Sequence, residues 1–240
     1  MSAEPILLAW SSGKDATLAF ARLRERDDVR VVGLLTSVTA GYDRVSIHGV
    51  RRSLLHAQAA ALGVPLHEVV LPMRCSNEDY DAALAATLAR LREETPALRR
   101  IAYGDIHLED VRRYREERLA PLGWTLDFPL WGESPRALAD EVCARGIAAR
   151  LVCVDTTQLD AAFAGRAYDA ALLRELPAAV DPCGERGEFH TFVHAAPMFA
   201  APITIEVGET VLRDGRFAYC DLRERNPRGA SDRAPRATSR

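Results

Sequence analysis

The stretch from Pro5 to Leu23, PILLAWSSGKDATLAFARL, decides the fold. It begins with a short apolar run, Pro5 to Trp10, which predicts a strand buried on both faces. After a turn of small polar residues, Ser11 to Asp15, apolar residues recur at the spacing of a helix through Arg24. A second, β-branched run from Val29 to Leu35 predicts another strand. This order of elements predicts one βαβ unit.

The alternation of strands and helices continues beyond this unit. Apolar patterns predict helices over 50–62, 76–94 and 108–122 and strands over 65–71, 100–103 and 125–130. Because such alternation needs crossover connections, we expect an α/β fold with a doubly wound, mostly parallel, Rossmann-like sheet. Ligands bind these sheets beyond the carboxyl ends of the strands, so the chemistry is expected just after Trp10, Leu35, Leu71 and Tyr103.

The pattern changes after about residue 130. It predicts a helix from Ser134-Pro135 to Gly146, a strand over 148–154, a helix over 169–176 and strands over 189–193 and 203–207. Asp214-Gly215 predicts a hairpin turn between 210–212 and 217–219. We therefore expect a sheet domain over 1–130, a smaller α+β portion over 131–225 at the ligand end of the sheet, and a disordered tail over 226–240.

The composition is that of an ordinary globular protein, with 48% apolar and 27% charged residues among 240 and a net charge of −3. The apolar runs are far shorter than the roughly 20 residues that span a membrane, and the first residues do not form an export signal, so a cytoplasmic location without a membrane is expected. The acidic balance makes nucleic acid an improbable partner. The five cysteines are widely spaced without a Cys-x-x-Cys pair, which argues against a disulfide framework and a zinc ribbon.

One basic residue differs from all the others. Of the 31 basic residues, Lys14 alone is a lysine, and it stands inside the glycine-containing turn between the first strand and its helix. A compact ammonium can sit against a phosphate among backbone amides, where a wide, planar guanidinium cannot. The position of Lys14 therefore indicates a specific role for this turn.

The turn Ser11-Ser12-Gly13-Lys14-Asp15 is typical of an anion site. The first amides of a helix are unpaired and carry a partial positive charge, and a glycine lets the backbone approach phosphate oxygens. Lys14 adds a full charge, and Asp15 can hold a magnesium ion that bridges phosphates. A helix cap by a serine would explain the serines, but neither Gly13 nor Lys14. A Walker A loop is excluded, because Leu8 and Asp15 stand where that motif needs glycine and Ser or Thr.

The same turn resembles the pyrophosphate loop, most often Ser-Gly-Gly-Lys-Asp-Ser, of the adenine nucleotide alpha hydrolase-like ATP pyrophosphatases. Those enzymes cleave ATP between its α- and β-phosphates. In this chain Ser12 replaces a glycine and Ala16 replaces the final serine, and Thr17 is a candidate to replace the lost hydroxyl.

A second segment follows the fourth predicted strand. Gly104-Asp105 stands at the carboxyl end of that strand, where ligands bind. Glu109, Arg112 and Glu116 follow at spacings of three and four, on one face of the predicted helix. A solvated, salt-bridged face explains these three charges equally well. Asp105 is the stronger candidate for the site.

A third segment, Asp181 to Thr191 (DPCGERGEFHT), is dense in glycine and ionisable residues, which favours a functional loop. Because the strand is predicted to begin at Phe189, Glu188 and His190 are expected to share one face of it. We expect these two residues to handle a proton or orient a substrate. A zinc site is not expected here.

These segments, with Phe128-Pro129-Leu130-Trp131 between the second and the third, resemble the diphthine–ammonia ligase family over about residues 6–222. Members of that family use ATP to activate a carboxylate as an acyl-adenylate. Ammonia then attacks it, with release of AMP and pyrophosphate. The diphthine-specific members carry Gly-Glu-Gly-Gly-Glu-Phe-Glu-Thr, whereas this chain has His190 at the position of the last glutamate. The chain looks closer to the uncharacterised bacterial branch, whose acceptor need not be diphthine.

The resemblance implies an ATP-dependent carbon–nitrogen ligase that uses ATP and Mg²⁺, with a small or protein-borne carboxylate and ammonia or an amine as partners and a homodimer as a candidate assembly. The candidate catalytic residues are Lys14, Asp105, Glu188 and His190, and the candidate metal ligands are Asp15 and Asp105. The candidate nucleotide-binding residues are Ser11, Ser12, Gly13, Lys14, Asp15, Thr17, Thr36, Ser37 and Gly104, with adenine near Thr36 to Val38. The candidate substrate-binding residues are Glu109, Arg112, Glu185, Glu188, His190 and Thr191.

Two alternatives stay open at this point. A tRNA-modifying ATP pyrophosphatase would share the loop, although the acidic balance and the absence of Cys-x-x-Cys pairs argue against it. A non-catalytic module that binds adenine nucleotides would also share the loop. Release of AMP and pyrophosphate distinguishes an enzyme from such a module.

Overall fold

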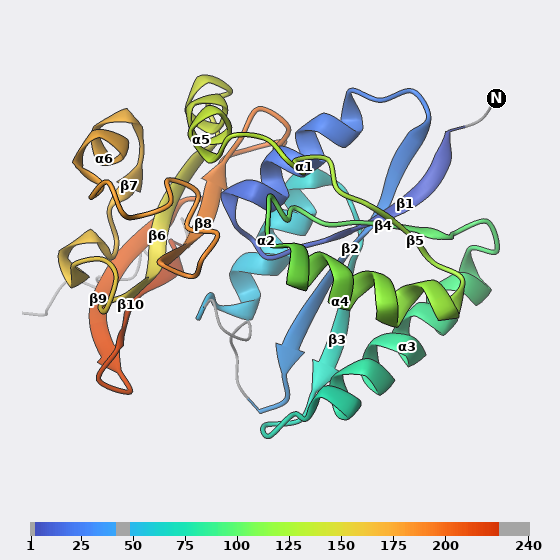
Figure 1. The fold of residues 1–240 in the computed structure, drawn as a ribbon. Coiled ribbons are helices and arrows are strands. Elements are labelled where there is room, and N and C mark those ends of the chain that lie inside the picture. Colours follow the sequence, from blue (N-terminus) through green and yellow to red (C-terminus); the bar gives the residue numbers. More distant parts are fainter. Residues whose placement is uncertain (1–2, 42–48, 226–240) are drawn as a thin grey trace, which may run out of the picture.

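The computed structural model describes residues 3–41 and 49–225 (Figure 1). Its strands form two sheets of five strands each. The predicted tail, 226–240, lies outside the described residues. Within the described ranges, no helix is long and apolar enough to cross a membrane.

The first sheet is parallel throughout, which confirms the predicted α/β class. Its strands are β1 (Glu4–Ala9), β2 (Val29–Thr39), β3 (Leu66–Leu71), β4 (Arg100–Ala102) and β5 (Thr125–Asp127), in the order β3-β2-β1-β4-β5. The connections contain α1 (Lys14–Arg24), α2 (Arg52–Leu62), α3 (Asn77–Glu94), α4 (Glu109–Leu119) and the short 3₁₀ helix η1 (Ala120–Leu122). The strand order reverses between β1 and β4. In open α/β sheets, a ligand crevice forms at this kind of reversal.

Helices cover both faces of this sheet. Leu18 of α1 and Leu54 of α2 are fully buried in one hydrophobic cluster, and Leu84 and Leu88 of α3 are buried in a second cluster with Leu7 and other strand residues. The sheet is therefore doubly wound, as predicted. A capping box begins α3 at the residue where the helix was predicted to start, because the Ser76 side chain accepts from the Asp79 amide and the Asp79 side chain accepts from the Ser76 amide.

The second sheet is antiparallel and belongs to the C-terminal part of the chain. This part contains α5 (Pro135–Ala144), β6 (Ala148–Asp155), the 3₁₀ helix η2 (Ala161–Phe163), β7 (Ala167–Tyr168), α6 (Ala170–Glu175), β8 (Phe189–Ala195), β9 (Ile205–Arg213) and β10 (Phe217–Glu224). The strand order is β7-β6-β10-β9, and β8 pairs with β6. The predicted hairpin joins β9 and β10, with Asp214 and Gly215 both at positive φ.

The C-terminal part packs on the α1 and α2 side of the first sheet (Figure 1). The Val193 amide of β8 donates to the Ser12 carbonyl at 3.0 Å, and the Ala200 amide donates to the Ala61 carbonyl at 2.7 Å. The first of these bonds ties β8 directly to the predicted phosphate loop. The segment that leads into β8, residues 181–188, is thereby brought to the ligand end of the parallel sheet.

Some element boundaries differ from the prediction. The strand predicted over 125–130 ends at Asp127, because the chain turns after Phe128 and the Trp131 amide donates to the Phe128 carbonyl at 3.1 Å. The strands predicted over 203–207 and 210–212 are a single strand, β9, whose pairing with β10 is irregular between Cys220 and Leu222. The short elements η2 and β7 were not predicted.

Candidate active site

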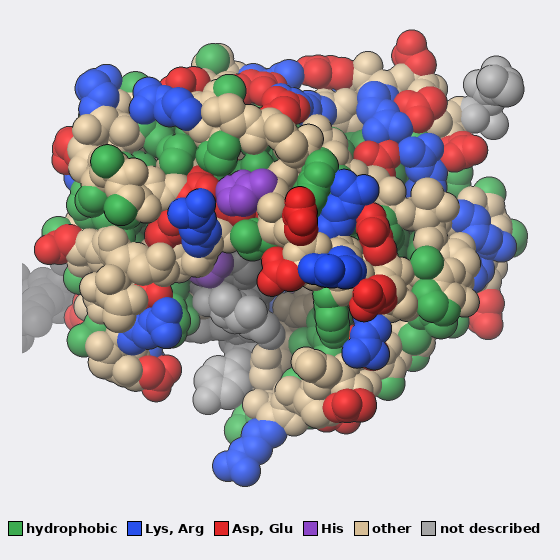
Figure 2. All heavy atoms as spheres, viewed as in Figure 1, with side chains coloured by type: hydrophobic (Ala, Val, Ile, Leu, Met, Phe, Trp, Pro, Cys, Tyr) green, Lys and Arg blue, Asp and Glu red, His purple; other side chains and the backbone are tan. Residues whose placement is uncertain are grey.

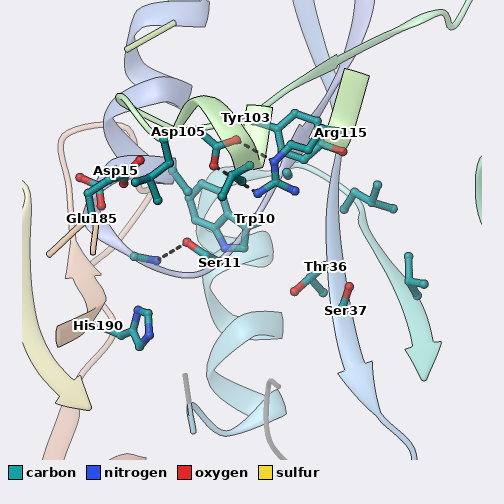
Figure 3. Close-up of a pocket in the computed structure, with 18 of the residues that line it drawn as sticks. Trp10, Ser11, Asp15, Thr36, Ser37, Tyr103, Asp105, Arg115, Glu185 and His190 are labelled. Carbon is teal, nitrogen blue, oxygen red and sulfur yellow. Dashed lines mark hydrogen bonds and ion pairs between the residues drawn. The ribbon is translucent and has the colours of Figure 1, made fainter. Parts of the chain in front are cut away.

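A cavity of about 750 Å³ opens at the carboxyl ends of β1, β2 and β4. The residues 183–185 and 189–191 of the C-terminal part form its other wall. Figure 3 shows Asp15, Glu185 and His190 on one side of this cavity and Thr36 and Ser37 on the other. The cavity therefore unites the three motifs that the sequence places far apart.

The predicted phosphate loop lies in the cavity wall at the start of α1. Helix α1 begins at Lys14, Gly13 occupies its N-cap position without a side-chain cap, and the Gly13 amide donates to the Ser11 hydroxyl at 3.3 Å. Ser11, Gly13 and Asp15 contribute to the cavity wall. The Gly13 and Lys14 amides donate to the Ser11 and Thr191 hydroxyls, so what the helix start presents to the cavity here is its partial positive charge.

Ser12 adopts a backbone conformation that favours glycine. Its φ is 70°, in the left-handed region, and its side chain is fully buried. The Ser12 hydroxyl has no hydrogen-bond partner within residues 3–41 and 49–225. The related pyrophosphate loops commonly have glycine here, and the geometry explains that preference, since glycine adopts positive φ without steric cost.

Gln58 of α2 supports the phosphate loop through side-chain hydrogen bonds. Its amide group donates to the Ser12 carbonyl at 3.0 Å and to the Val193 carbonyl at 2.7 Å, and its oxygen accepts from the Trp10 indole at 2.9 Å. The side chain is completely buried. Gln58 thus connects the end of β1, the loop and β8, a role that the sequence analysis missed because no local pattern marks it.

Gly104 packs against the first turn of α1. A Cβ atom at this position would lie 3.1 Å from the Ala16 nitrogen and 3.1 Å from the Asp15 carbonyl carbon. Both contacts are with backbone atoms, which cannot move aside without displacing the helix start. Glycine at the end of β4 therefore allows the two strand ends at the reversal point to approach each other.

Lys14 does not point into the cavity as expected of a phosphate ligand. Its side chain is 2% exposed, and its ammonium donates to the Asp15 carboxylate at 2.8 Å and to the Cys183 carbonyl. The ammonium also lies 5.2 Å from the Tyr168 ring centroid and 5.5 Å from that of Phe189. Burial lowers the pKa of Lys14, but the charges of Asp15, Cys183 and Glu185 and the hydrogen bond to Asp15 together outweigh this effect, so the pKa is raised.

Thr17 is also placed differently from the expectation. Its hydroxyl is fully buried and donates to the Gly13 carbonyl at 2.9 Å, one turn back along α1. Thr17 therefore stabilises the first turn of the helix rather than replacing the serine hydroxyl that is lost at Ala16.

Asp105 lies in the wall, where the sequence predicts it, and it is paired with an arginine. The Arg115 guanidinium donates to both Asp105 oxygens, at 2.7 and 3.2 Å, and lies 4.2 Å from the Tyr103 ring centroid. Arg115 lines the cavity together with Leu108 and Val111 of the same helical face. These three residues, rather than the predicted face of α4, are directed toward the site.

The predicted face of α4 lies elsewhere. Glu109, Arg112 and Glu116 line a separate depression beside Trp131. The Arg112 guanidinium lies 4.7 Å from the Trp131 ring centroid and donates to Glu116 at 2.8 Å. The simpler interpretation, a salt-bridged helix face, therefore describes these charges, and the structure does not support Glu109 and Arg112 as contacts of a substrate in the main cavity.

Glu188 is a structural residue of the loop rather than part of the cavity wall. Its side chain is buried, and its carboxylate accepts from the Asp181 amide at 2.9 Å and from the Arg186 amide at 3.0 Å. Both carboxylate oxygens are thus used to fold the loop that precedes β8. The expected roles of Glu188 in proton transfer and substrate binding do not agree with this placement.

Glu185, His190 and Thr191 lie in the cavity wall, as predicted. The Glu185 carboxylate accepts from the Ile106 amide at 2.9 Å, and the Thr191 hydroxyl accepts from the Lys14 amide at 3.1 Å. Burial raises the pKa of Glu185 to about 7 even though the Ile106 amide opposes the shift. A carboxyl group with such a pKa can accept or donate a proton near neutral pH.

The far end of the cavity suits a flat, apolar ring. Thr36 and Ser37 at the end of β2 line it, together with the apolar side chains Val69, Leu71 and Leu84. Thr36 is buried and Ser37 partly exposed. This end lies across the cavity from Asp15 and Glu185 (Figure 3).

A metal ion would have few carboxylate ligands here. Within the described ranges, no group of three or more His, Cys, Asp or Glu residues is arranged to hold a metal ion. Asp15 and Asp105 both face the cavity, but they are paired with Lys14 and Arg115. This set fits Mg²⁺ only in the mode in which one or two carboxylates bind an ion that is also bound by substrate phosphates.

Two family models place the chain among known proteins. A family model described as the diphthamide synthase N-terminal domain matches residues 5–122, and a model described as the diphthamide synthase C-terminal domain matches residues 134–225. A search of curated proteins found no match to the chain. The two matched segments together span most of the chain, which therefore belongs to the diphthamide synthase, or diphthine–ammonia ligase, family of ATP-using enzymes.

Proposed function

We propose that the protein is an ATP-dependent carbon–nitrogen ligase that adenylates a carboxylate and transfers ammonia or an amine to it. The observation that carries this proposal is the composition of one cavity wall. The open start of α1 faces the cavity at Gly13 and Asp15, and Glu185 and His190 face the same space from the C-terminal part. A volume of about 750 Å³ is that of a small-molecule site.

The nucleotide would lie along the carboxyl ends of the parallel strands. Its phosphates would accept hydrogen bonds from the amides at the start of α1, and its adenine would lie near Thr36 and Ser37. A carboxylate oxygen of the acceptor attacks the α-phosphorus of ATP, which forms the acyl-adenylate and releases pyrophosphate. The helix start stabilises the negative charge that develops on the leaving phosphates.

The second step needs a neutral nitrogen nucleophile. Ammonia attacks the acyl carbon, AMP leaves with the bonding electrons, and one proton must be removed from the nitrogen. Glu185 is the proposed proton acceptor, through Oε2, because its Oε1 is held by the Ile106 amide. Its pKa of about 7 supports this role, since the group is partly ionised at neutral pH.

Magnesium would be bound by Asp15, Asp105 or both, together with phosphate oxygens. When bound, it would neutralise part of the phosphate charge. The Arg115 guanidinium holds the Asp105 carboxylate in the cavity wall, where it would face such an ion.

The acceptor is proposed to be a small or protein-borne carboxylate rather than a nucleic acid. Acidic and basic side chains are interspersed on the face of the molecule shown in Figure 2, and that face does not present the continuous basic surface that tracks a phosphate backbone. This mixture supports the ligase over a tRNA-modifying relative. A homodimer in the cytoplasm stays part of the proposal.

An exchange assay tests the adenylation step directly. Wild-type protein is incubated with Mg²⁺, ATP, labelled pyrophosphate and each member of a set of carboxylates. Label should enter ATP only in the presence of the true acceptor, and ammonia should then produce AMP. Asp15→Asn should abolish exchange, whereas the matched variant Glu109→Gln, which alters the separate depression, should not. Tight ATP binding without exchange or AMP for any carboxylate would favour a nucleotide-sensing module instead.

A further inference from the structure

The single lysine of the chain holds two separate segments together. The loop from Asp181 to Glu188, here called the acceptor loop, precedes β8 and carries Glu185 into the cavity. The Lys14 ammonium donates to the Cys183 carbonyl of this loop and to the Asp15 carboxylate. The bond to Cys183 joins residues that are 169 positions apart in the sequence.

The surroundings of the ammonium form a closed cage. Aromatic rings lie on its other sides, with Tyr168 at 5.2 Å and Phe189 at 5.5 Å from ring centroid to Nζ. The Tyr168 hydroxyl in turn donates to the Pro182 carbonyl at 2.7 Å, so the cage itself is bonded to the acceptor loop. The buried cation thus lies between two rings and donates to three oxygens, two of Asp15 and one of Cys183, which compensate for its burial.

The acceptor loop contains several hydrogen bonds within itself, and it is also attached to the rest of the C-terminal part, since the Cys183 thiol donates to the Pro135 carbonyl at 3.2 Å and the Asp155 amide donates to the Glu188 carbonyl at 2.9 Å. Its amides at Asp181 and Arg186 donate to the Glu188 carboxylate, and its Cys183 amide donates to the Asp181 carboxylate. These bonds give the loop a fixed shape but do not attach it to the phosphate loop. The bond from Lys14 to Cys183 supplies that attachment, while the bond from the Ile106 amide to Glu185 ties the acceptor loop to the segment after β4.

We propose that Lys14 is a positioning residue that fixes the acceptor loop against the phosphate loop, so that Glu185 faces the bound nucleotide, and that its ammonium is not a phosphate ligand. This inference rests on the proposed ligase function for the role of Glu185. It also explains the single lysine in a chain whose other cations are arginines. A planar guanidinium is too wide for a cage of this size, whereas a compact ammonium fits it.

Amide exchange and nucleotide affinity test the proposal together. Lys14→Met is compared with wild type and with Arg90→Met, a control that removes a cation from an exposed helical ion pair with Glu94. In Lys14→Met, deuterium exchange in the acceptor loop should accelerate about tenfold to a hundredfold, because the variant loses the hydrogen bonds of a charged group. The Kd of Mg²⁺ with a non-hydrolysable ATP analogue should change by less than about threefold. Arg90→Met should alter neither quantity.

The opposite pattern would overturn the proposal. If Lys14 is a phosphate ligand, its replacement weakens binding of the analogue strongly and leaves the exchange of the acceptor loop unchanged. Loss of analogue binding together with faster exchange also contradicts a purely positioning role. Neither the exchange rate nor the analogue affinity depends on the acceptor. The positioning role of Lys14 can therefore be disproved without disproving the ligase function, and it can be supported even if no acceptor is found.

A milder variant covers the case in which Lys14→Met does not fold. Tyr168→Phe removes only the hydroxyl that donates to Pro182. Exchange in the acceptor loop should then rise about threefold, as expected for one neutral hydrogen bond, with unchanged affinity for the analogue. Unchanged exchange in Tyr168→Phe would contradict the cage as the attachment of this loop.

Chemical labelling gives a third readout, because Lys14 is the only lysine. An amine-reactive ester should modify Lys14 far more slowly in the native wild-type protein than in the unfolded chain, since the ammonium is buried. Labelling should accelerate in Tyr168→Phe in step with exchange of the loop. Labelling of native Lys14 at the rate of the unfolded chain would show that the cage does not persist in solution.

Discussion

The Arg115 guanidinium binds the Asp105 carboxylate through two hydrogen bonds, Nε to Oδ2 at 2.7 Å and Nη2 to Oδ1 at 3.2 Å. Because Arg115 also lies over the Tyr103 ring, Asp105 is held from one side and its position in the cavity wall is fixed. Lysine can reproduce the charge of Arg115 but neither the paired hydrogen bonds nor the stacking.

Arg115→Lys should therefore reduce kcat/KM by about tenfold to a hundredfold, which corresponds to one or two charge-assisted hydrogen bonds. The measurement is acceptor-dependent AMP formation. Arg113→Lys on the same helix is the matched control, since Arg113 belongs to the separate depression beside Trp131. Equal activities of the two variants would show that the pairing with Asp105 has no part in the reaction.

Ser12→Gly should stabilise the protein. The φ of 70° at Ser12 costs a side-chain-bearing residue about 1–2 kcal/mol, and the buried hydroxyl lacks a partner within the described ranges. Thermal unfolding should show a rise in Tm of about 2–4 °C for each kcal/mol gained. Ser76→Gly, which removes the cap of α3 at an ordinary negative φ, should lower the Tm instead. A lower Tm for Ser12→Gly would mean that the hydroxyl makes a contact that outweighs the backbone strain.

The ionisation of Glu185 should determine how activity falls on the acidic side, or acidic limb, of the pH–activity profile. Its pKa is about 7 in the folded protein, so the carboxyl is mostly protonated below that pH and cannot accept a proton. Activity with ammonia should therefore rise as the pH passes through about 7. Glu185→Gln should lower kcat and remove this limb, while Glu109→Gln should keep it. A limb that persists in Glu185→Gln would assign the titration to another group.

The same shift has a consequence for stability. Because the folded pKa of Glu185 lies above that of an unfolded glutamate, the native state binds more protons between about pH 4.5 and 7, and this group lowers the stability as the pH rises through that window. Glu185→Gln should therefore stabilise the protein more at pH 8 than at pH 4.5. Urea unfolding at the two pH values measures this difference, and an equal effect at both would contradict the raised pKa.

Glu188→Gln should act on stability rather than on the pH profile. The glutamate carboxylate accepts from two backbone amides, and a glutamine has only one oxygen for them, so one amide would lose its partner. A buried amide left without a partner costs about 1–3 kcal/mol. Thermal unfolding should show the loss, while the pH dependence of kcat should stay that of the wild type. A displaced pH limb with unchanged stability would restore Glu188 to the catalytic role that the sequence suggests.

Local patterns predicted the fold well, because the βαβ units depend on features that lie close together in the chain. The apolar run before Ser11, the helical spacing after Asp15 and the capping box at Ser76 each determine an element through neighbouring residues. The location of the cavity was predictable for the same reason, since parallel strands bring their carboxyl ends to one edge of the sheet. Ser11, Gly13, Asp15 and Asp105 accordingly lie where the sequence places them.

The side chains whose placement differs from the sequence-based expectation are placed by contacts between distant segments. Lys14 points toward Cys183 instead of the cavity because the acceptor loop supplies a carbonyl oxygen and the strands β7 and β8 supply the Tyr168 and Phe189 rings, none of which a local pattern near Lys14 reveals. On α4, by contrast, the sequence did contain a usable signal. Leu108 and Val111 are apolar residues at helical spacing in a charged helix, and the next position on their face is Arg115.

The central claim is that the start of α1 receives the phosphates of ATP. A crystal structure of the protein with Mg²⁺ and a non-hydrolysable ATP analogue tests it most directly. Phosphate oxygens should lie against the first turn of α1, adenine should lie beside Thr36 and Ser37, and the Lys14 ammonium should still be bound to the Cys183 carbonyl. A nucleotide bound elsewhere, with the turn from Ser11 to Asp15 making no contact to phosphate, would contradict it.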